Sequence, residues 1–230
     1  PIIAIDGPAG AGKSTVTKGL AKKLGLLYLD TGAMYRAISW LVLKEKISIN
    51  DNLSISKLVN HSKIELKVDA EDKSQVWINK INITDDIRSP KVTSIVSNIA
   101  AKESIRKALT KQQQEMGLEG GIVAEGRDIG SSVFPDAELK IFLTATIQER
   151  ARRRIIDLKS KNFEPPKQSE IELQIEERDR MDSNREISPL IKAKDAIELI
   201  TDGMSIDEVI DAIYDLFRIK VPEEAWPSRN

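Results

Sequence analysis

The sequence predicts an α/β fold in which helices wrap a parallel β-sheet. Short, continuous apolar runs rich in β-branched residues recur along the 230-residue chain, and longer helical patterns separate them. Continuous runs are typical of strands buried on both faces, and the intervening helices supply the crossovers that parallel strands need. In chain order the expected strands are residues 2–5, 26–29, 122–124, 139–143 and 197–200.

Local signals give the expected helix boundaries. The first helix is expected to begin around Lys13 and to stop at Gly25, a residue type that favours helix C-termini. One long helix is expected from about residue 91 to 116. Three later helices are expected to open with capping boxes, in which a hydroxyl side chain and an acidic side chain three residues later each bond the backbone N–H of the other residue. The expected pairs are Thr146 with Glu149, Ser169 with Glu172 and Ser205 with Glu208.

Residues 63–84 depart from this rhythm. Apolar and polar residues alternate there with a period of two, as in Ile64, Leu66 and Val68, and polar turns separate the segments. Such alternation is typical of antiparallel strands with one solvated face. The sequence therefore predicts a small antiparallel sheet inserted into the α/β frame.

Composition restricts the partners and the compartment. The formal net charge is -1, so no overall positive field attracts nucleic acid or an anionic membrane. The absence of cysteine excludes disulfides and thiolate sites and suits a reducing cytoplasm. No apolar run approaches the about 20 residues of a membrane span, and no secretory signal precedes the first strand. We expect a cytoplasmic protein without a membrane or nucleic-acid partner.

A phosphate-binding loop follows the first expected strand. The pattern Gly7-x-x-x-x-Gly12-Lys13-Ser14 lies between that strand and a helix, which is the context that the motif requires. Its backbone N–H groups and the helix N-terminus are suited to phosphate, Lys13 to the β- and γ-phosphates and Ser14 to Mg²⁺. The sequence thus predicts a site for a nucleoside triphosphate. The loop comprises Gly7, Pro8, Ala9, Gly10, Ala11, Gly12, Lys13, Ser14 and Thr15.

Two other classes of phosphate-loop protein fit poorly. A GTPase switch would need a guanine-reading Asn-Lys-x-Asp, and the nearest string, residues 79–82, reads Asn-Lys-Ile-Asn. A motor or helicase would need a much longer chain and a basic track. A small-molecule kinase agrees best with the size of the chain.

Charged residues at strand ends indicate a second phosphate site. Glu125, Arg127 and Asp128 directly follow an apolar run, and buried charges need partners. Ligands of open parallel sheets bind at the carboxyl edge, where these side chains are expected. Arg178, Asp182 and Arg185 are expected on one helical face, with a surface ion pair as the alternative. Residues 150–154, RARRR, are either a phosphate-binding segment, a solvated helix face or a basic targeting patch.

On these residues the chain resembles bacterial cytidylate kinases, a family of nucleoside monophosphate kinases. The segments that carry the resemblance are IDGPAGAGKST, LDTGAMYR, EGRDIGSSVFPDAELKIFL, ERARRR, ERDRMDSNR and DGMSIDEVI. The resemblance implies the P-loop nucleoside-monophosphate-kinase fold, with a five-stranded parallel sheet and a small antiparallel β insertion. It also implies a core of residues 1–34, 91–145 and 186–220, a monophosphate-binding insertion at 35–90, a lid at 146–185 and a C-terminal tail at 221–230. The tail contains two prolines and is expected to be loose.

The resemblance assigns roles to individual residues. Lys13, Arg127 and Arg178 are the implied catalytic residues, and Arg153 and Gly203 join the loop in binding ATP. The implied acceptor-binding residues are Thr31, Tyr35, Arg36, Ser97, Arg106, Gly126, Arg127, Asp128, Arg178, Asp182 and Arg185. Ser14, together with Glu125 through a water molecule, is expected to hold Mg²⁺. Two positions vary within the family pattern: Glu125 stands where Asp also occurs, and Thr31 where Ser is also found.

The implied reaction is Mg²⁺-dependent phosphoryl transfer from ATP to CMP or dCMP, a step of pyrimidine nucleotide metabolism. We expect the enzyme to be a monomer. The alternative within the same class is a kinase for UMP or AMP. Alternatives outside it are a nucleotide-dependent binding module and an RNA-binding protein that uses RARRR, against which the near-neutral net charge argues.

Overall fold

The computed structural model describes residues 1–118 and 121–227. The chain divides into two compact units, one formed by residues 1–28 and 119–230 and the other by residues 29–118. Among the helices of the described residues, none combines the length and the apolar character that crossing a membrane requires.

The larger unit is built on a five-stranded sheet with the order β2-β6-β1-β7-β8. The strand β1 pairs in parallel with β6 and β7, and β7 pairs in parallel with β8. The prediction of a five-stranded parallel sheet is therefore confirmed. The strands are β1 (Ile2–Asp6), β2 (Leu27–Asp30), β6 (Ile122–Gly126), β7 (Leu139–Thr144) and β8 (Ile197–Ile200).

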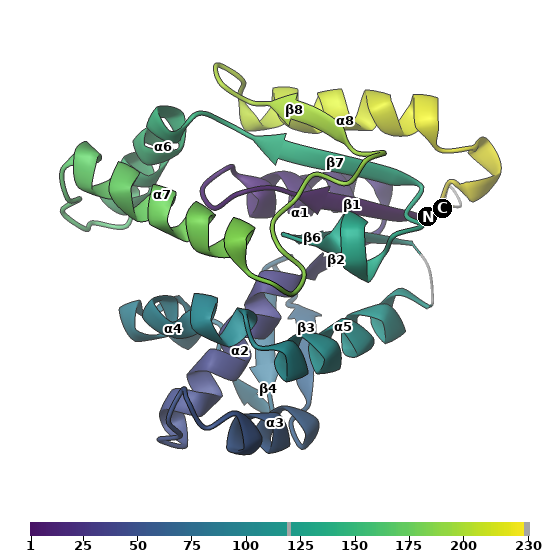
Figure 1. The fold of residues 1–230 in the computed structure, drawn as a ribbon. Helices are drawn as coiled ribbons and strands as arrows, with labels where there is room; N and C mark the ends of the chain where they lie inside the picture. The colour runs from purple at the N-terminus through teal and green to yellow at the C-terminus, as the bar shows by residue number, and fades with distance from the viewer. Residues whose placement is uncertain (119–120, 228–230) are drawn as a thin grey trace. The chain divides into compact units, whose positions relative to one another are not determined.

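Two helices complete the core of this unit. The helix α1 (Lys13–Leu24) packs beside α8 (Ile206–Lys220), as Figure 1 shows. Leu20 of α1 and Phe217 of α8 are both buried, and they belong to one apolar cluster with the buried side chains of β1 and β7. This packing fixes the N-terminus of α1 directly after the turn that leaves β1. The phosphate-binding sequence lies in that turn.

A helical hairpin leaves the sheet after β7. The helices α6 (Ile147–Ser160) and α7 (Gln168–Asn184) pack through Ala151, Ile171 and Ile175 and lie at the left of Figure 1. The remaining elements of this unit are the π-helical turn η2 (Ile129–Val133) and the 3₁₀ turn η3 (Glu223–Ala225).

The smaller unit contains a three-stranded antiparallel sheet with the order β3-β4-β5. This confirms the sheet predicted from alternation in residues 63–84. The strands are β3 (Ile64–Val68), β4 (Ser74–Ile78) and β5 (Ile81–Asn82), and the 3₁₀ turn η1 (Asp86–Arg88) follows them. The helices are α2 (Thr31–Lys44), α3 (Asn52–Asn60), α4 (Pro90–Ala100) and α5 (Glu103–Gly117).

Three expectations about helices and the tail were wrong. Two helices replace the single one expected from 91 to 116, because Lys102 adopts an extended conformation between α4 and α5. The helix α7 begins at Gln168 with Lys167 as its cap, so Ser169 lies inside the first turn. Residues 221–227 are not loose, since the Trp226 ring lies 5.7 Å from that of Phe217. Residues 228–230 of the tail lie outside the described residues.

Candidate active site

The loop between β1 and α1 has a backbone that depends on glycine. A Cβ atom on Gly7 would lie 1.9 Å from the carbonyl oxygen of Leu143, so a larger residue would displace β7. Gly12, with a φ of 80°, is the N-cap of α1 and has no side chain to cover the first N–H groups of the helix. Uncovered N–H groups and the helix dipole favour an anion at this end of α1. The loop therefore has the properties of a phosphate site.

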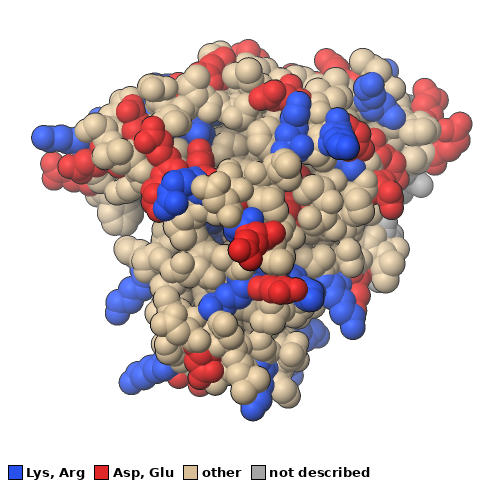
Figure 2. Space-filling view, in the orientation of Figure 1, with Lys and Arg blue, Asp and Glu red and all other residues tan. Residues whose placement is uncertain are grey.

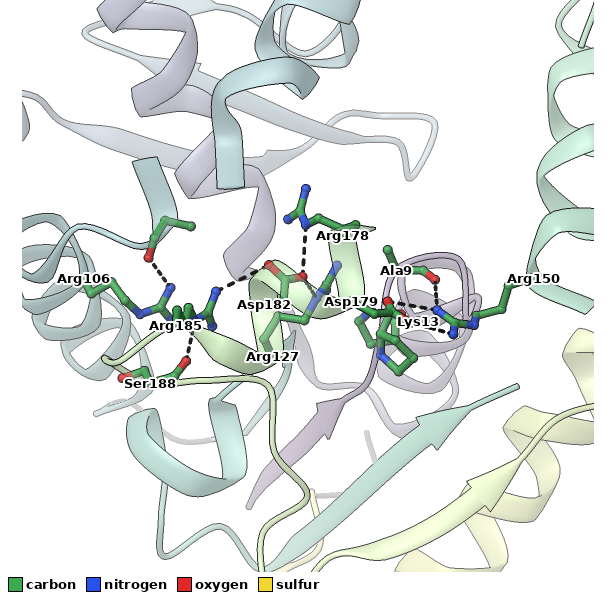
Figure 3. Close-up of polar contacts among 12 residues, drawn as sticks. Ala9, Lys13, Arg106, Arg127, Arg150, Arg178, Asp179, Asp182, Arg185 and Ser188 are labelled. Atoms are coloured by element: carbon green, nitrogen blue, oxygen red, sulfur yellow. Dashed lines mark hydrogen bonds and ion pairs between the residues drawn. The ribbon is translucent and has the colours of Figure 1, made fainter. Parts of the chain in front are cut away.

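Lys13 is the buried cation of this loop. Its Nζ donates a hydrogen bond to the carbonyl oxygen of Pro8 at 2.9 Å, so the side chain folds back over the loop (Figure 3). Burial, reinforced by the positive charge of Arg127, lowers the pKa of Lys13 to about 7. The nearby carboxylates of Glu125 and Asp6 act in the opposite direction and are outweighed. Additional negative charge in the loop would stabilise the protonated amine.

A hydroxyl–carboxylate pair lies at the start of α1. Ser14 Oγ donates a hydrogen bond to Glu125 Oε1 at 2.6 Å, and Glu125 is buried at the end of β6. Oxygen ligands of this kind suit Mg²⁺, which usually takes one or two protein ligands and completes its shell with phosphate and water. In the described part of the chain, no group of three or more His, Cys, Asp and Glu side chains could hold a metal by itself. The pair therefore fits a Mg²⁺ ion that is shared with bound phosphates.

Asp6 was not predicted from the sequence. It ends β1, it is buried, and its two carboxylate oxygens accept hydrogen bonds of 2.8 Å from the backbone N–H groups of Ile129 and Gly130. Burial raises the pKa of Asp6 to about 6 against these two hydrogen bonds. The carboxylate thus ties the end of β1 to the turn that directly follows Asp128.

Asp182 is the centre of an arginine cluster. Its Oδ2 lies 3.1 Å from Nε of Arg127 and 3.0 Å from Nε of Arg178, and its Oδ1 lies 3.7 Å from Nη1 of Arg185 (Figure 3). Burial by itself would raise the pKa of Asp182, and the positive charges of Arg127 and Arg178 outweigh burial and lower it. Burial lowers the pKa of Arg178 in turn. The cluster carries more positive than negative charge, as a phosphate site requires.

The geometry of Arg185 differs from the prediction. The helix α7 ends at Asn184, and Arg185 has an extended backbone with φ -65° and ψ 141°. It therefore does not share a helical face with Arg178. It reaches Asp182 from the following segment, and its Nε donates to the carbonyl oxygen of Ser188 at 2.6 Å. The three residues meet nevertheless. Arg178 and Asp182 do form the i,i+4 ion pair of the alternative reading, but the pair does not lie at the surface because Asp182 is buried.

The arginines of residues 150–154 have different surroundings. Arg150 is buried, whereas Arg152 and Arg154 expose more than half of their side chains and pair with acids of their own helix. Arg153 Nη1 and Nη2 bind the hydroxyl and the carbonyl oxygen of Thr201, each at 2.9 Å. Arg153 thus contacts the segment that leads to Gly203, to which the resemblance also assigns ATP binding. On the face shown in Figure 2, basic and acidic side chains are interspersed.

The smaller unit holds Thr31, Tyr35, Arg36, Ser97 and Arg106 of the predicted acceptor residues, whereas Gly126 and Asp128 lie in the larger unit, at the end of β6 and just after it. Thr31 is the first residue of α2, and Arg36 Nη1 binds the carbonyl oxygen of Ile87 at 3.0 Å and Oγ1 of Thr93 at 2.9 Å. The Arg106 guanidinium is buried 4.8 Å from the ring of Tyr35, and its Nη1 binds the carbonyl oxygen of Ala100. The half-buried Ser97 lies on α4. Within this unit, Tyr35 and Arg106 are therefore in contact.

The phosphate loop, the hydroxyl–carboxylate pair and the arginine cluster on a parallel sheet define a phosphate-loop protein of the kinase class. A family model described as cytidylate kinase matches residues 3–219. The chain therefore belongs to the cytidylate kinase family.

Curated relatives agree with this membership. The chain is 58% identical over 228 residues to "Bifunctional pantoate ligase/cytidylate kinase" of Prochlorococcus marinus strain MIT 9303, a match that covers 99% of this chain and 47% of the relative. The protein of the same name from Synechococcus sp. strain CC9311 is also 58% identical over 228 residues, with 99% and 46% covered. The chain thus spans less than half the length of these relatives.

The fold also occurs in a solved structure of low sequence similarity. An uncharacterized protein from Eubacterium ventriosum ATCC 27560 aligns with a TM-score of 0.52 at 12% identity. The alignment covers 95% of this chain and 98% of that one. At this identity, the likeness concerns the fold alone.

Proposed function

We propose that this chain catalyses transfer of the γ-phosphate of ATP to CMP or dCMP, giving ADP and CDP or dCDP. The observation that carries the proposal is the family match over residues 3–219, because it includes both the phosphate loop and the arginine cluster. The names of the curated relatives include the same activity beside a pantoate ligase activity.

The phosphate loop is proposed to hold the donor. The backbone N–H groups of Gly7 to Thr15 would bind the phosphates, and the positive end of α1 would add to their stabilisation. Lys13 would leave the carbonyl oxygen of Pro8 for the β- and γ-phosphates, which accept its three donors more strongly than a single carbonyl does. Gly203 is proposed to lie at the adenine of ATP, and Arg153 is proposed to reach the ATP phosphates.

Ser14 and Glu125 are proposed to hold Mg²⁺, with Glu125 acting through a water molecule. The fit rests on their hydrogen bond and on the buried carboxylate. When bound, Mg²⁺ would neutralise charge on the transferred phosphate.

The arginine cluster is proposed to hold the acceptor phosphate. Arg127 and Arg178 already converge on Asp182 through Nε, which leaves the outer nitrogens of each guanidinium for a second anion. Thr31, Tyr35, Arg36, Ser97, Arg106, Gly126, Asp128 and Arg185 complete the proposed acceptor-binding set, with Ser97, Arg106 and Asp128 for the cytosine edge. The predicted division into core, monophosphate-binding insertion and lid belongs to the same proposal.

The chemistry places modest demands on the protein. The phosphate oxygen of CMP that attacks is largely ionised at neutral pH, so no strong general base is required. Lys13, Arg127 and Arg178 would bring two polyanions together and neutralise the charge that would otherwise separate them. Closure of residues 146–185 would exclude water, which competes as an acceptor. The monomeric state and the cytoplasmic location expected from the sequence stay predictions.

A coupled spectrophotometric assay tests the proposal. ADP release from ATP is followed with CMP, dCMP, UMP, AMP or no acceptor, at matched concentrations and with Mg²⁺. The expected order has CMP and dCMP well above UMP and AMP. ADP release with UMP or AMP as the preferred acceptor would assign a different monophosphate kinase, and ATP binding without acceptor-dependent release would indicate a binding module.

A further inference from the structure

A buried ion pair joins the helical hairpin to the phosphate loop. Arg150 Nη1 and Nη2 bind the two carboxylate oxygens of Asp179 at 3.1 and 2.6 Å, so the pair is bidentate between α6 and α7. Arg150 Nε binds the carbonyl oxygen of Ala145 at 3.1 Å. Arg150 Nη1 also donates to the carbonyl oxygen of Ala9, inside the phosphate loop, at 3.0 Å (Figure 3).

These contacts hold the guanidinium in one orientation. The side chain of Arg150 is 5% exposed and that of Asp179 is 22% exposed, so the pair is largely withdrawn from water. A planar guanidinium whose Nε and outer nitrogens are all engaged cannot rotate without breaking several charge-assisted hydrogen bonds. The Nη1 donor that faces Ala9 is therefore fixed by the partners on the other sides of the guanidinium group.

The contact with Ala9 determines how one peptide group of the loop is turned. The carbonyl of Ala9 and the N–H of Gly10 belong to the same planar peptide and point in opposite directions. Gly10 has a φ of 74°, a conformation from which a glycine peptide flips readily. By holding the Ala9 oxygen on the side of α6, Arg150 directs the Gly10 N–H away from α6.

We propose that Arg150 and Asp179 are positioning residues for the donor nucleotide: Asp179 orients Arg150, and Arg150 fixes the Ala9–Gly10 peptide with its N–H turned toward the phosphates. The inference rests on the proposed function, in which this loop binds ATP. The proposal gives Arg150, the buried arginine of residues 150–154, a role other than direct phosphate binding. It also gives Asp179, which no sequence motif singled out, a role in ATP affinity.

Calorimetric titration with ATP in the absence of acceptor tests the proposal. Arg150→Met and Asp179→Asn are expected to raise the Kd for ATP by about tenfold or more, the scale of one hydrogen bond to a charged group. Steady-state kinetics should show the same rise in KM for ATP, with KM for CMP unchanged within about twofold. Asp179→Glu keeps the carboxylate and is expected to restore most of the affinity. Arg180→Met and Glu177→Gln, which alter an exposed ion pair of α7, are the matched controls.

A variant that exchanges the two residues distinguishes positioning of the Ala9–Gly10 peptide from a purely structural link between α6 and α7. The double variant Arg150→Asp with Asp179→Arg keeps an ion pair between α6 and α7 and removes the donor to Ala9. Positioning predicts that its ATP affinity stays low, whereas full recovery would overturn the proposal. ATP affinity within about twofold of the unaltered chain in folded Arg150→Met would overturn it equally.

Two further outcomes are decided by the same data. Should Arg150→Met fail to fold by circular dichroism, the comparison of Asp179→Asn with Asp179→Glu carries the test, and equal ATP affinity in the two would contradict the proposal. The Kd for ATP is measured without acceptor, so it decides the role of the pair even in a chain that does not phosphorylate CMP. Failure of the proposed function and failure of this inference are therefore distinguishable.

Discussion

Ser14 Oγ lies 2.6 Å from Glu125 Oε1, and this hydrogen bond joins the first turn of α1 to the end of β6. The two residues are 111 positions apart in the chain, and they meet because β1 and β6 are neighbours in the sheet. The hydrogen bond holds the Ser14 hydroxyl, which is proposed to bind Mg²⁺, against the buried carboxylate of Glu125.

Glu125→Gln is expected to weaken the response to Mg²⁺. The substitution keeps the size of the side chain and removes the negative charge that would hold a metal-bound water. The Mg²⁺ concentration for half-maximal rate at saturating ATP should rise about tenfold or more, the scale for loss of an outer partner of a metal. Glu170→Gln, at an exposed position of α7, is the control. An unchanged Mg²⁺ response in folded Glu125→Gln would exclude Glu125 from the metal site.

Lys13→Ala is expected to lower turnover by about 10²–10³ or more, the scale for losing one preorganised charge stabiliser. The reason is its buried position over the loop, where its charge would lie next to the bound phosphates. Single-turnover rates with saturating ATP and CMP measure the effect without a contribution from weaker binding. Near-normal turnover would contradict the assignment of this loop to the donor phosphates.

ATP binding is expected to take up a proton at alkaline pH. The pKa of Lys13 is lowered to about 7, so at about pH 8 the amine is mostly neutral before binding and protonated afterwards, because phosphate raises its pKa again. Uptake should approach one proton at about pH 8 and fall toward zero near pH 6, and affinity should weaken as pH rises above about 7. Calorimetry in buffers with different ionisation enthalpies measures this uptake. Lys13→Arg, which stays charged, should remove it.

Asp182→Asn is expected to destabilise the larger unit by about 3 kcal/mol, because it leaves partly buried arginines without their buried carboxylate. This corresponds to a fall in Tm of about 6–12 °C. The pKa of Asp182 is lowered in the folded chain, so its contribution is present above the ordinary value of 3.8 and is lost as pH falls below it. The difference in Tm between the two proteins should thus be smaller near pH 3 than at about pH 7. Asp211→Asn, in an exposed pair, is the control.

Asp128→Ala is expected to impair the use of CMP more than the binding of ATP. The carboxylate is buried next to the turn that Asp6 holds, and its proposed partner is the cytosine edge. The ratio of kcat/KM for CMP to that for UMP should therefore fall. Equal losses for CMP and UMP would rule out a base-reading role.

The sequence was sufficient to predict the strands, because buried parallel strands are continuous apolar runs and each run became a strand. At the sheet edge formed by β8, burial is not continuous, since the residues of β8 alternate between half-buried and exposed. The break at Lys102 was not predictable. The apolar periodicity continues through it without glycine or proline, and the break follows from packing, since α4 packs on α2 and α5 on α3.

The candidate site was predictable where a motif defines it and not where long-range contacts do. Lys13 and Ser14 lie in a contiguous pattern with a known physical role. Asp6 and Asp179 each act on backbone or side chains far away in the sequence, and no local spacing reveals such partners. For the same reason Ser169 was a wrong helix start: packing of Ile171 against Ala151 outweighs a local capping preference.

Transfer of ³²P from the γ position of ATP to CMP tests the proposed function most directly. The purified chain is incubated with labelled ATP, Mg²⁺ and CMP, and the nucleotides are separated by chromatography. Label is expected in the β position of CDP, with far less in UDP when UMP replaces CMP, and almost none in CDP with Lys13→Ala. Label that appears only as inorganic phosphate, at a rate independent of CMP, would contradict phosphoryl transfer to a monophosphate.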